Sequence, residues 1–473
     1  MNSKKYSLGI DIGTTSVKVC IYDSETDKIL SKQSKDTQAN VPSQMGSEAD
    51  KQDVPKIISA LHSCVSRLPK DLLKQIKVIG VCGQMHGVML WSNTTEGFCW
   101  DRTESPGTNS GVKFEVIRSR VSDLYTWQDT RCDSAFLQSL PHPESHVQIH
   151  TGFGCATLFW LSRNCPDKLT KFNCSGTIQD FVVALLCNLQ SPVMSSQNAA
   201  AWGYYNTTSN TWNMNILEKA NFPVHLLPKV VKPNELVGTL PESWFGIPSG
   251  TPVGVALGDF QCSVMATLKN ENEAVLNIST SAQIAYLMAP SFEPNPSPIP
   301  PPLTYFVYFN GRYLAVGASL NGGNVLATFV KMLQQWTLDL GFSVPQSKVW
   351  EKVTELGDKS EGGSSLVIVP TLLGERHIPE QNASVTNLDH SNLGLGQIFR
   401  ALCSGLVKNL QGMIPKDQLI ASKIVKIIGS GSALIRNKVL QKEVEAQYQL
   451  PVEFVGGRGA CVGAAMAVNP PTN

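Results

Sequence analysis

Residues 8–18 place an acid, a glycine and three hydroxyl side chains where a nucleotide phosphate could bind. Asp11 lies near the end of a stretch of alternating apolar residues, and Gly13 follows two positions later. A tight turn after such a strand exposes backbone N–H groups and hydroxyls to an anion, and a carboxylate beside it can hold hydrated Mg2+. An ordinary hairpin with a polar turn has the same local pattern. We predict that Asp11 holds Mg2+ through water, and that the phosphate is contacted by Thr14, Thr15, Ser16 and Lys18, the last of which equally fits a solvated strand position.

A second acid stands at the end of an apolar run in the middle of the chain. Residues 252–257 are predicted to form a buried strand, which ends in Gly258-Asp259. A carboxylate at a strand end can act as a general base toward a hydroxyl group; alternatively, Asp259 caps the helix that we expect to follow. A further strand at 275–278 leads into a turn of three hydroxyl residues, including Thr280. Two such strand ends, far apart in the chain, indicate two lobes that face one cleft.

These side chains need a scaffold, and hydrophobic periodicity predicts one. Alternating residues indicate strands at 8–11, 17–20, 29–31 and 76–81, and apolar residues at helical spacing indicate a helix over 54–68. Three strands, a helix and a strand in this order are typical of an α/β fold with a mixed sheet. In the second half we predict helices at 322–336, 393–413 and 435–448, strands at 366–369 and 424–428, and a glycine-rich turn at 429–432.

The length of 473 residues is too great for one ordinary core and predicts two large domains. Prolines at 228, 233, 241 and 248 interrupt the middle of the chain, so we place an N-terminal domain at 1–249 and a C-terminal domain at 250–473. Residues 289–302 hold seven prolines, which excludes a helix or a central strand. We predict a surface loop there, with a docking segment for a partner protein as the alternative.

Charge and composition exclude several classes of partner. The formal net charge of +1, from 39 basic and 38 acidic residues, does not favour binding to nucleic acid. The apolar runs are too short to span a bilayer, so no membrane partner is predicted. The twelve cysteines include no C-x-x-C pair, which argues against a zinc or redox motif. Without an apolar leader we expect a cytoplasmic protein with free thiols. The oligomeric state is not readable from the sequence.

Eight short segments, in matching order along the chain, resemble the FGGY family of carbohydrate kinases within the actin, hexokinase and heat-shock ATPase superfamily. They are G-I-D-I-G-T-T-S-V-K (9–18), G-Q-M-H-G (83–87), W-Q-D-T-R (127–131), G-V-A-L-G-D (254–259), I-S-T-S (278–281), L-N-G-G-N (320–324), G-E-R-H-I-P (374–379) and G-S-G-S-A (429–433). The resemblance implies a two-lobed actin/hexokinase-like ATPase fold, each lobe a mixed sheet flanked by helices, with a cleft between them. It also implies an enzyme that uses ATP and Mg2+ to phosphorylate a terminal hydroxyl of a small-molecule sugar.

The resemblance further implies a role for each matching residue. Asp259 would contact the sugar and accept the proton of its hydroxyl. The other expected sugar contacts are Gln84, Met85, His86, Trp127, Asp129 and Arg131. The expected nucleotide contacts are Thr280, Gly323, Gly429, Gly431 and Asn437. His86 also fits a structural histidine and Trp127 a core residue, while Glu375-Arg376 equally fits a structural salt bridge and receives no catalytic role.

Two departures from the family pattern affect these expectations. Ser279 stands where the family usually has glycine, and its Cβ would restrict how closely the backbone approaches a phosphate. Phe260 follows the catalytic aspartate where a polar residue is common, which would reshape the sugar pocket. Segments 151–157, 195–204, 275–281 and 318–330 resemble the members that act on a seven-carbon ketose. The alternatives are a kinase for xylulose or glycerol, a sugar-independent ATPase switch, and a pseudokinase; retention of both aspartates argues against the last.

Overall fold

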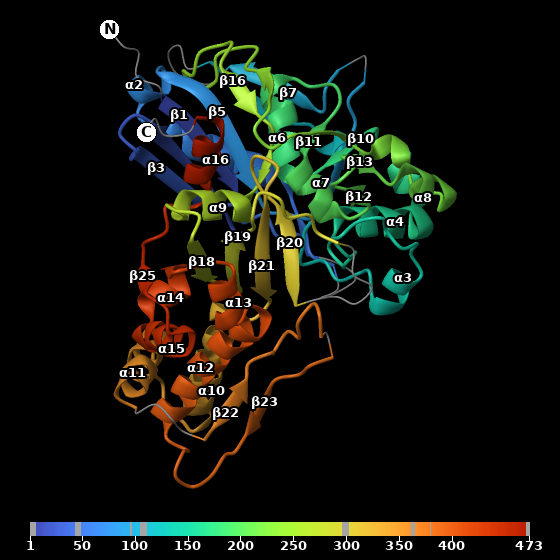
Figure 1. The fold of residues 1–473 in the computed structure, drawn as a ribbon. Helices are drawn as coiled ribbons and strands as arrows, with labels where there is room; N and C mark the ends of the chain where they lie inside the picture. The colour runs from blue at the N-terminus through green and yellow to red at the C-terminus, as the bar shows by residue number, and fades with distance from the viewer. Residues whose placement is uncertain are drawn as a thin grey trace.

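Two large mixed sheets organise the protein, one built mainly from the first half of the chain and the other from the second. The computed structural model describes residues 6–42, 49–94, 97–104, 111–295, 302–360, 365–378 and 380–469. In Figure 1 the first sheet lies in the blue upper part of the molecule and the second in the yellow and olive middle, with the orange and red helices below.

The first sheet has the strand order β15-β16-β5-β1-β2-β3, and β17 also pairs with β5. β1 runs antiparallel to β2 and parallel to β5, so the sheet is mixed as predicted. The predicted strand over 252–257 is two short strands, β16 and β17, which both join this first sheet. The strands are β1 (Tyr6–Ile12), β2 (Ser16–Asp23), β3 (Lys28–Asp36), β5 (Ile76–Gly83), β15 (Leu236–Thr239), β16 (Pro252–Gly254) and β17 (Leu257–Gly258).

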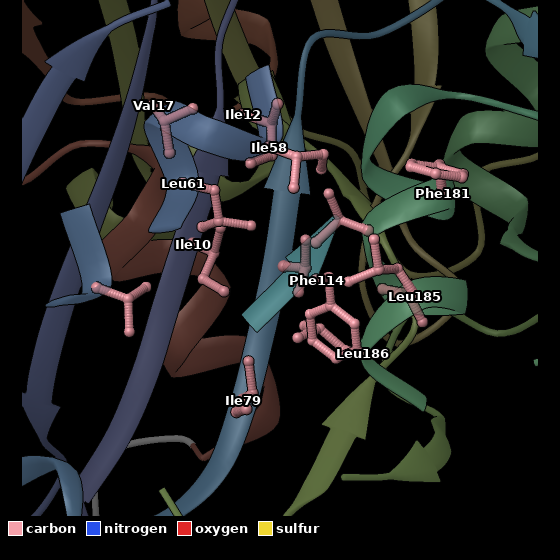
Figure 2. Close-up of a cluster of buried hydrophobic side chains, with 14 of the residues drawn as sticks. Ile10, Ile12, Val17, Ile58, Leu61, Ile79, Phe114, Phe181, Leu185 and Leu186 are labelled. Atoms are coloured by element: carbon pink, nitrogen blue, oxygen red, sulfur yellow. The ribbon is translucent and has the colours of Figure 1, made fainter. Parts of the chain in front are cut away.

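Opposite faces of the first sheet carry different side chains, because successive residues of a strand point to opposite sides. Leu8, Ile10 and Ile12 of β1 are fully buried against helices α1 (Val54–Ser66) and α6 (Ile178–Cys187). Figure 2 shows this cluster, where Ile10 and Ile58 gather with aromatic and leucine side chains from α6 and β8 (Val112–Val116).

The other face of this sheet is covered by the last helix of the chain, α16 (Ala460–Val468). A Cβ at Gly9 would come within 1.8 Å of the Cys461 carbonyl oxygen, and one at Gly80 within 1.9 Å of the Ala464 carbonyl oxygen. Glycine at both positions therefore allows α16 to lie directly on the strands. The red α16 beside the blue strands in Figure 1 shows how the chain end returns to the first sheet.

The second sheet has the order β20-β21-β19-β18-β24-β25. Its apolar face packs against α10, α12 and α15, and the buried side chains form a second core. The elements are β18 (Glu273–Ile278), β19 (Ala282–Leu287), β20 (Leu303–Val307), β21 (Tyr313–Ser319), β24 (Lys426–Ser430), β25 (Val452–Phe454), α10 (Gly323–Asp339), α11 (Gln346–Lys359), α12 (Leu395–Met413), α14 (Ser432–Arg436) and α15 (Lys438–Tyr448).

Between β5 and β15 the chain forms an additional region of short helices and two-stranded sheets with its own apolar cluster. Its main elements are β6 (Met89–Trp91), β9 (Leu124–Tyr125), β10 (Cys174–Gly176), β11 (Val193–Ser195), β12 (Tyr205–Asn206), β13 (Thr211–Trp212), β14 (Lys229–Val231), α3 (Ser134–Gln138), α4 (Gly154–Asn164), α5 (Pro166–Leu169), α7 (Ser196–Trp202) and α8 (Met214–Lys219). Two further antiparallel pairs are β7 (Trp100–Glu104) with β8, and β22 (Val367–Val369) with β23 (Ser384–Thr386). The remaining strand and helices are β4 (Lys51–Gln52), α2 (Lys70–Leu73), α9 (Asp259–Thr267) and α13 (Lys416–Ala421).

The predicted helices and strands agree with the structure except at the strand over 252–257, described above as two strands, and at one helix. The single helix expected over 435–448 is two helices, α14 and α15, which meet at Asn437. The Asn437 side chain accepts hydrogen bonds from the backbone N–H groups of Val439 and Leu440, so it begins a new helix instead of continuing the old one. Of the proline-rich segment, residues 296–301 lie outside the described part of the chain. Within that part, no helix is long and apolar enough to cross a membrane.

Candidate active site between the two sheets

A cavity of about 640 Å3, here named the phosphate cavity, lies between the sheets and is lined by both predicted acids, Asp11 and Asp259. The first sheet contributes Asp11 and the turn between β1 and β2. The second contributes the turn between β18 and β19 and the glycine-rich turn after β24. Hydroxyl and backbone N–H groups from both sides therefore face one space, which is the arrangement that a polyphosphate requires. The predicted phosphate contacts that line it are Thr14, Thr15, Ser16, Lys18, Thr280 and Gly431.

The β1–β2 turn is held in shape by hydrogen bonds to its backbone. The Gly13 N–H donates to the Ser16 carbonyl at 3.1 Å, which closes the turn. The Thr15 carbonyl accepts from the Thr37 N–H at 3.0 Å, and the Thr14 carbonyl accepts from Gln52 Nε2 at 2.6 Å. Thr14, Thr15 and Ser16 all line the cavity, and the Thr14 hydroxyl also contacts Trp127 and Gln84.

Asp11 and Asp259 influence each other electrostatically across this cavity. Asp11 is buried in β1, and burial raises the pKa of its carboxyl group, while Lys18 Nζ at 3.6 Å from Oδ2 opposes that rise. Burial, with a further contribution from the negative charge of Asp11, raises the pKa of Asp259 to about 7. Two carboxyl groups near one cavity with raised pKa values are a feature of catalytic and metal-binding sites.

Asp259 does not serve as the cap of the following helix. Gly258 occupies the N-cap position of α9, and Asp259 is the first residue of the helix itself. The carboxyl group lines both the phosphate cavity and a second cavity of about 250 Å3. Asp259 is therefore placed at the junction of the two cavities, with its carboxyl group available to a ligand.

The second cavity, here named the sugar cavity, brings together five of the residues predicted to bind sugar: Gln84, Met85, His86, Trp127 and Asp259. Trp127 Nε1 donates to Thr14 Oγ1 at 3.0 Å, so the tryptophan is positioned by the phosphate turn. His86 has a positive φ of 73°, its Nδ1 donates to the Ala201 carbonyl at 2.8 Å, and its ring stacks on Phe153 with centroids 4.4 Å apart. Burial lowers the pKa of His86 to about 3, so its ring is neutral near pH 7 and Nε2 is a hydrogen-bond acceptor.

Asp129 and Arg131 are not brought to either cavity. They form a buried two-point ion pair, in which Arg131 Nε donates to Asp129 Oδ1 and Arg131 Nη2 donates to Asp129 Oδ2, both at 2.7 Å. The Asp50 N–H also donates to Asp129 Oδ2 at 3.2 Å, and the Arg131 guanidinium lies 4.6 Å from the centre of the Tyr125 ring. These contacts hold the loop that carries Trp127, so in this structure the pair positions the site and does not line it.

A third cavity, of about 1050 Å3, opens between α10, α11 and α14 and is lined by Gly323, Thr280 and Asn437. Gly323 allows close approach of α10, because a Cβ there would lie 2.3 Å from the Ser279 carbonyl oxygen. Gly431 has φ of 97° and lines the phosphate cavity instead. Gly429 lines none of these three cavities and packs against Phe454 within the sheet.

Several lining residues were not predicted from the sequence. Trp350 and Arg436 line the third cavity, and their helices approach it only through tertiary packing. Gly456, Gly457 and Gly459 line the phosphate cavity just before α16. That glycine run ahead of a helix was a signal that could have been used, since such turns commonly approach phosphates.

The two departures from the family pattern have visible consequences. Ser279 has no positive φ, and its hydroxyl is 3.2 Å from Asn277 Oδ1 and 3.4 Å from the Ser432 N–H. A side chain is therefore accommodated there, where it ties the β18–β19 turn to the start of α14. Phe260 lines the sugar cavity and packs edge-to-face on Phe306. It therefore adds to the apolar part of the wall of that pocket.

Comparison with known proteins gives relatives that extend along the whole chain. Residues 6–99 and 109–266 match the N-terminal domain of the FGGY family of carbohydrate kinases. The chain is 46% identical to the sedoheptulokinases of Mus musculus and Homo sapiens, over 99% of its own length and 98% of theirs. The crystal structure of xylulose kinase from Rhodospirillum rubrum superposes with a TM-score of 0.78 at 18% identity, covering 98% of this chain and 90% of that one. The fold is the predicted two-lobed actin/hexokinase-like ATPase fold.

Proposed function

The chain belongs to the FGGY family of carbohydrate kinases and is a sugar kinase, and we propose that it transfers the γ-phosphoryl group of ATP to the terminal 7-hydroxyl of sedoheptulose. The observation that carries the choice of sugar is 46% identity to two sedoheptulokinases over 99% of the chain. Relatives named for glycerol or xylulose are far more distant, such as the xylulose kinase of Haemophilus influenzae at 21% identity. Sedoheptulose is a seven-carbon ketose, in agreement with the sequence prediction.

The position of Asp259 supports a direct role in phosphoryl transfer. Its carboxyl group borders the phosphate cavity on one side and the sugar cavity on the other. In the proposed reaction the sugar oxygen forms a bond to Pγ as the bond from Pγ to the bridging oxygen of ADP breaks. Asp259 takes the proton of the sugar hydroxyl, a contribution of roughly 10²–10⁴-fold in such reactions.

The rest of phosphoryl transfer is mainly the positioning of the reactants and the stabilisation of charge on the phosphate oxygens, and the hydrogen-bond donors around the phosphate cavity can provide both. The hydroxyls of Thr14, Thr15, Ser16 and Thr280 and the ammonium group of Lys18 are proposed to hold the phosphate oxygens. We assign the adenosine to the third cavity, whose walls include Gly323 and Asn437. Gly429 is proposed to act indirectly, by packing the strand that leads into this turn.

The donor set at Asp11 fits Mg2+ in the form used by nucleotide enzymes. Its buried carboxylate offers hard oxygen ligands, and no group of three metal-ligating side chains exists among the described residues. A Mg2+ ion usually keeps several waters and binds through one or two carboxylates together with phosphates, so a complete protein cage is not needed. When bound, the ion neutralises charge on the phosphates; Asp11 is proposed to hold it through water.

A substrate panel tests the proposal. Purified protein with MgATP should form ADP at the highest kcat/KM with sedoheptulose, and clearly more slowly with D-xylulose or glycerol. The product should carry one phosphate on the terminal carbon. Preference for another acceptor would replace the assigned sugar, while ADP formation at the same rate without sugar would instead favour a sugar-independent ATPase. We further propose two lobes whose division, expected at 249/250, lies beyond β17, because β16 and β17 belong to the first sheet. We also propose a cytoplasmic protein that binds sugar and nucleotide but neither nucleic acid nor membrane.

A further inference from the structure

Arg376 is a charged residue at the sugar cavity that the reaction described above does not use. Its guanidinium lines the cavity that holds Asp259 and also an adjoining cavity of about 340 Å3. Among the described residues it has no hydrogen-bond or ion-pair partner. The neighbouring Glu375 is already engaged, because its Oε1 accepts hydrogen bonds from Asn321 at 2.9 Å and Asn409 at 2.7 Å. The structural salt bridge considered as an alternative for this pair is therefore absent.

A half-buried guanidinium without a protein partner carries a desolvation cost. Burial lowers the pKa of Arg376, yet arginine keeps its charge and offers five donors and no acceptor. Structural arginines in protein interiors are normally paired, as Arg131 is with Asp129. A ligand with several oxygen acceptors would remove this cost.

The groups that surround Arg376 indicate a neutral polyol. His86 and His150 are both held neutral near pH 7, since burial lowers their pKa values to about 3 and 4, with Arg376 adding to the effect. A neutral imidazole can accept a hydrogen bond from a hydroxyl that itself accepts one from Arg376. His146 and His377 also have lowered pKa values, and the Glu293 carboxylate lines the same adjoining cavity. A carboxylate there disfavours an anionic ligand and is compatible with hydroxyl groups.

The adjoining cavity continues the sugar cavity away from the phosphates. The two share His86, Phe306, Ala318 and Arg376 in their walls, and Asp259 lines only the first. At about 250 Å3, the first alone is below the usual size of a small-molecule site, roughly 300–1,000 Å3. A longer sugar held with its terminal hydroxyl at Asp259 would extend toward Arg376.

We propose that Arg376, with His150, binds the non-reacting keto end of the sugar in the adjoining cavity and thereby selects long ketoses over short ones. This inference rests on the proposed function and adds a specificity-determining residue to it. Arg376 donates to the carbonyl and hydroxyl oxygens at carbons 1–3, and His150 accepts from a hydroxyl there. A five-carbon ketose that presents its terminal hydroxyl to Asp259 does not reach both groups.

The test compares Arg376→Gln with wild type on sedoheptulose and on D-xylulose. Loss of a charged hydrogen bond to the substrate typically costs about tenfold or more in kcat/KM. We expect a loss of this size for sedoheptulose, mainly through KM, and a change of less than about threefold for D-xylulose. Arg376→Lys should restore part of the preference, since it keeps the charge but not the planar fork. The matched control is Arg67→Gln, on the exposed end of α1, which should leave both sugars unchanged.

A second variant keeps the test valid if Arg376→Gln folds poorly. His150→Phe retains the ring next to Phe153 but removes the acceptor, and it should also reduce the sedoheptulose to xylulose ratio. An unchanged ratio in both variants, with wild type active on sedoheptulose, overturns the inference and leaves the proposed function standing. Wild type inactive on sedoheptulose but active on a shorter ketose overturns both.

Discussion

The indole N–H of Trp127 donates to the hydroxyl of Thr14 at 3.0 Å and so joins the sugar cavity directly to the phosphate turn. The bond is part of a wider network, since Thr14 Oγ1 lies 3.4 Å from Gln84 Oε1 and Gln84 Nε2 donates to Gln52 Oε1 at 3.0 Å. Gln52 Nε2 in turn donates to the Thr14 carbonyl at 2.6 Å. Gln52, which holds the Thr14 carbonyl of the β1–β2 turn, is thus connected with Gln84 and, through Thr14, with Trp127. Both Gln84 and Trp127 line the sugar cavity.

Replacing Trp127 by phenylalanine should therefore weaken the binding of both substrates. Trp127→Phe keeps an aromatic ring but removes the donor to Thr14. The net value of one such hydrogen bond is about 0.5–1.5 kcal/mol, so we expect KM to rise by roughly two- to tenfold for sugar and for MgATP. Steady-state kinetics with each substrate varied in turn would measure this. The matched control is Trp336→Phe, an exposed tryptophan on α10, which should change neither KM.

The proposed catalytic role of Asp259 predicts a large loss of turnover without loss of nucleotide binding. Asp259→Asn keeps the shape of the side chain but cannot take the proton of the sugar hydroxyl, so kcat should fall by roughly 10²–10⁴-fold. The Kd for nucleotide, measured by calorimetry, should stay within a few-fold of wild type. Asp71→Asn, at an exposed residue of α2, is the control. A variant at Asp259 that keeps more than about a tenth of the wild-type kcat would exclude the general-base role.

The raised pKa of Asp259 predicts how activity depends on pH. A general base works only when ionised, and its pKa is about 7, so kcat/KM for the sugar should rise with pH through that value and then level off. The negative charge of Asp11 contributes to the rise in pKa. In Asp11→Asn the midpoint should therefore move to lower pH, by only part of the total shift because burial is the larger cause. A midpoint that stays in place would show that the two carboxyl groups are not coupled.

The proposed magnesium site predicts a separate effect of changing Asp11. Asp11→Asn removes the carboxylate that would hold the hydrated ion beside the phosphates, so more Mg2+ should be needed for half-maximal activity and the KM for MgATP should rise. The KM for sugar should change much less, because Asp11 lines the phosphate cavity and not the sugar cavity. Activity measured over a Mg2+ series at fixed ATP would show the difference. Identical Mg2+ curves for variant and wild type would make Asp11 a structural residue.

Local patterns were enough to predict the parts of the site that are themselves local. The β1–β2 turn is closed by a bond between Gly13 and Ser16, and the strand that leads to Asp259 is buried throughout, so each is encoded within a few residues. The prediction of one helix over 435–448 was wrong because apolar spacing continues across Asn437. Only the side-chain cap at that residue separates the two helices.

Features that depend on distant contacts could not be predicted in this way. Asp129 and Arg131 stand in a motif that was predicted to bind sugar, yet their charges pair with each other. The Asp50 N–H completes the arrangement from 79 residues away. The unpartnered state of Arg376 likewise depends on Glu375 being engaged by Asn321 and Asn409. Spacing along the chain gives a residue's type and neighbours but not which partner its charge will have in the folded protein.

The distribution of lining residues predicts that the protein closes when both substrates are bound. The first sheet carries Asp11 and the turn with Thr14, while Ser281 and Gly431 face the same cavity from the second sheet. A phosphate held by donors from both sides draws the sheets together, and closure excludes water from the γ-phosphate. We expect sugar plus a non-hydrolysable ATP analogue to lower the radius of gyration more than either ligand alone.

Solution scattering on the four states, free, with sugar, with analogue and with both, would measure this compaction. Closure that requires sugar also predicts slow ATP hydrolysis in its absence, because water then reaches an incomplete site. The Asp259→Asn variant provides a control, since it should compact with the same ligands while failing to turn over. An unchanged radius with both ligands, combined with sugar-independent hydrolysis, would mean that the site is complete in the open form and that lobe closure has no part in the reaction.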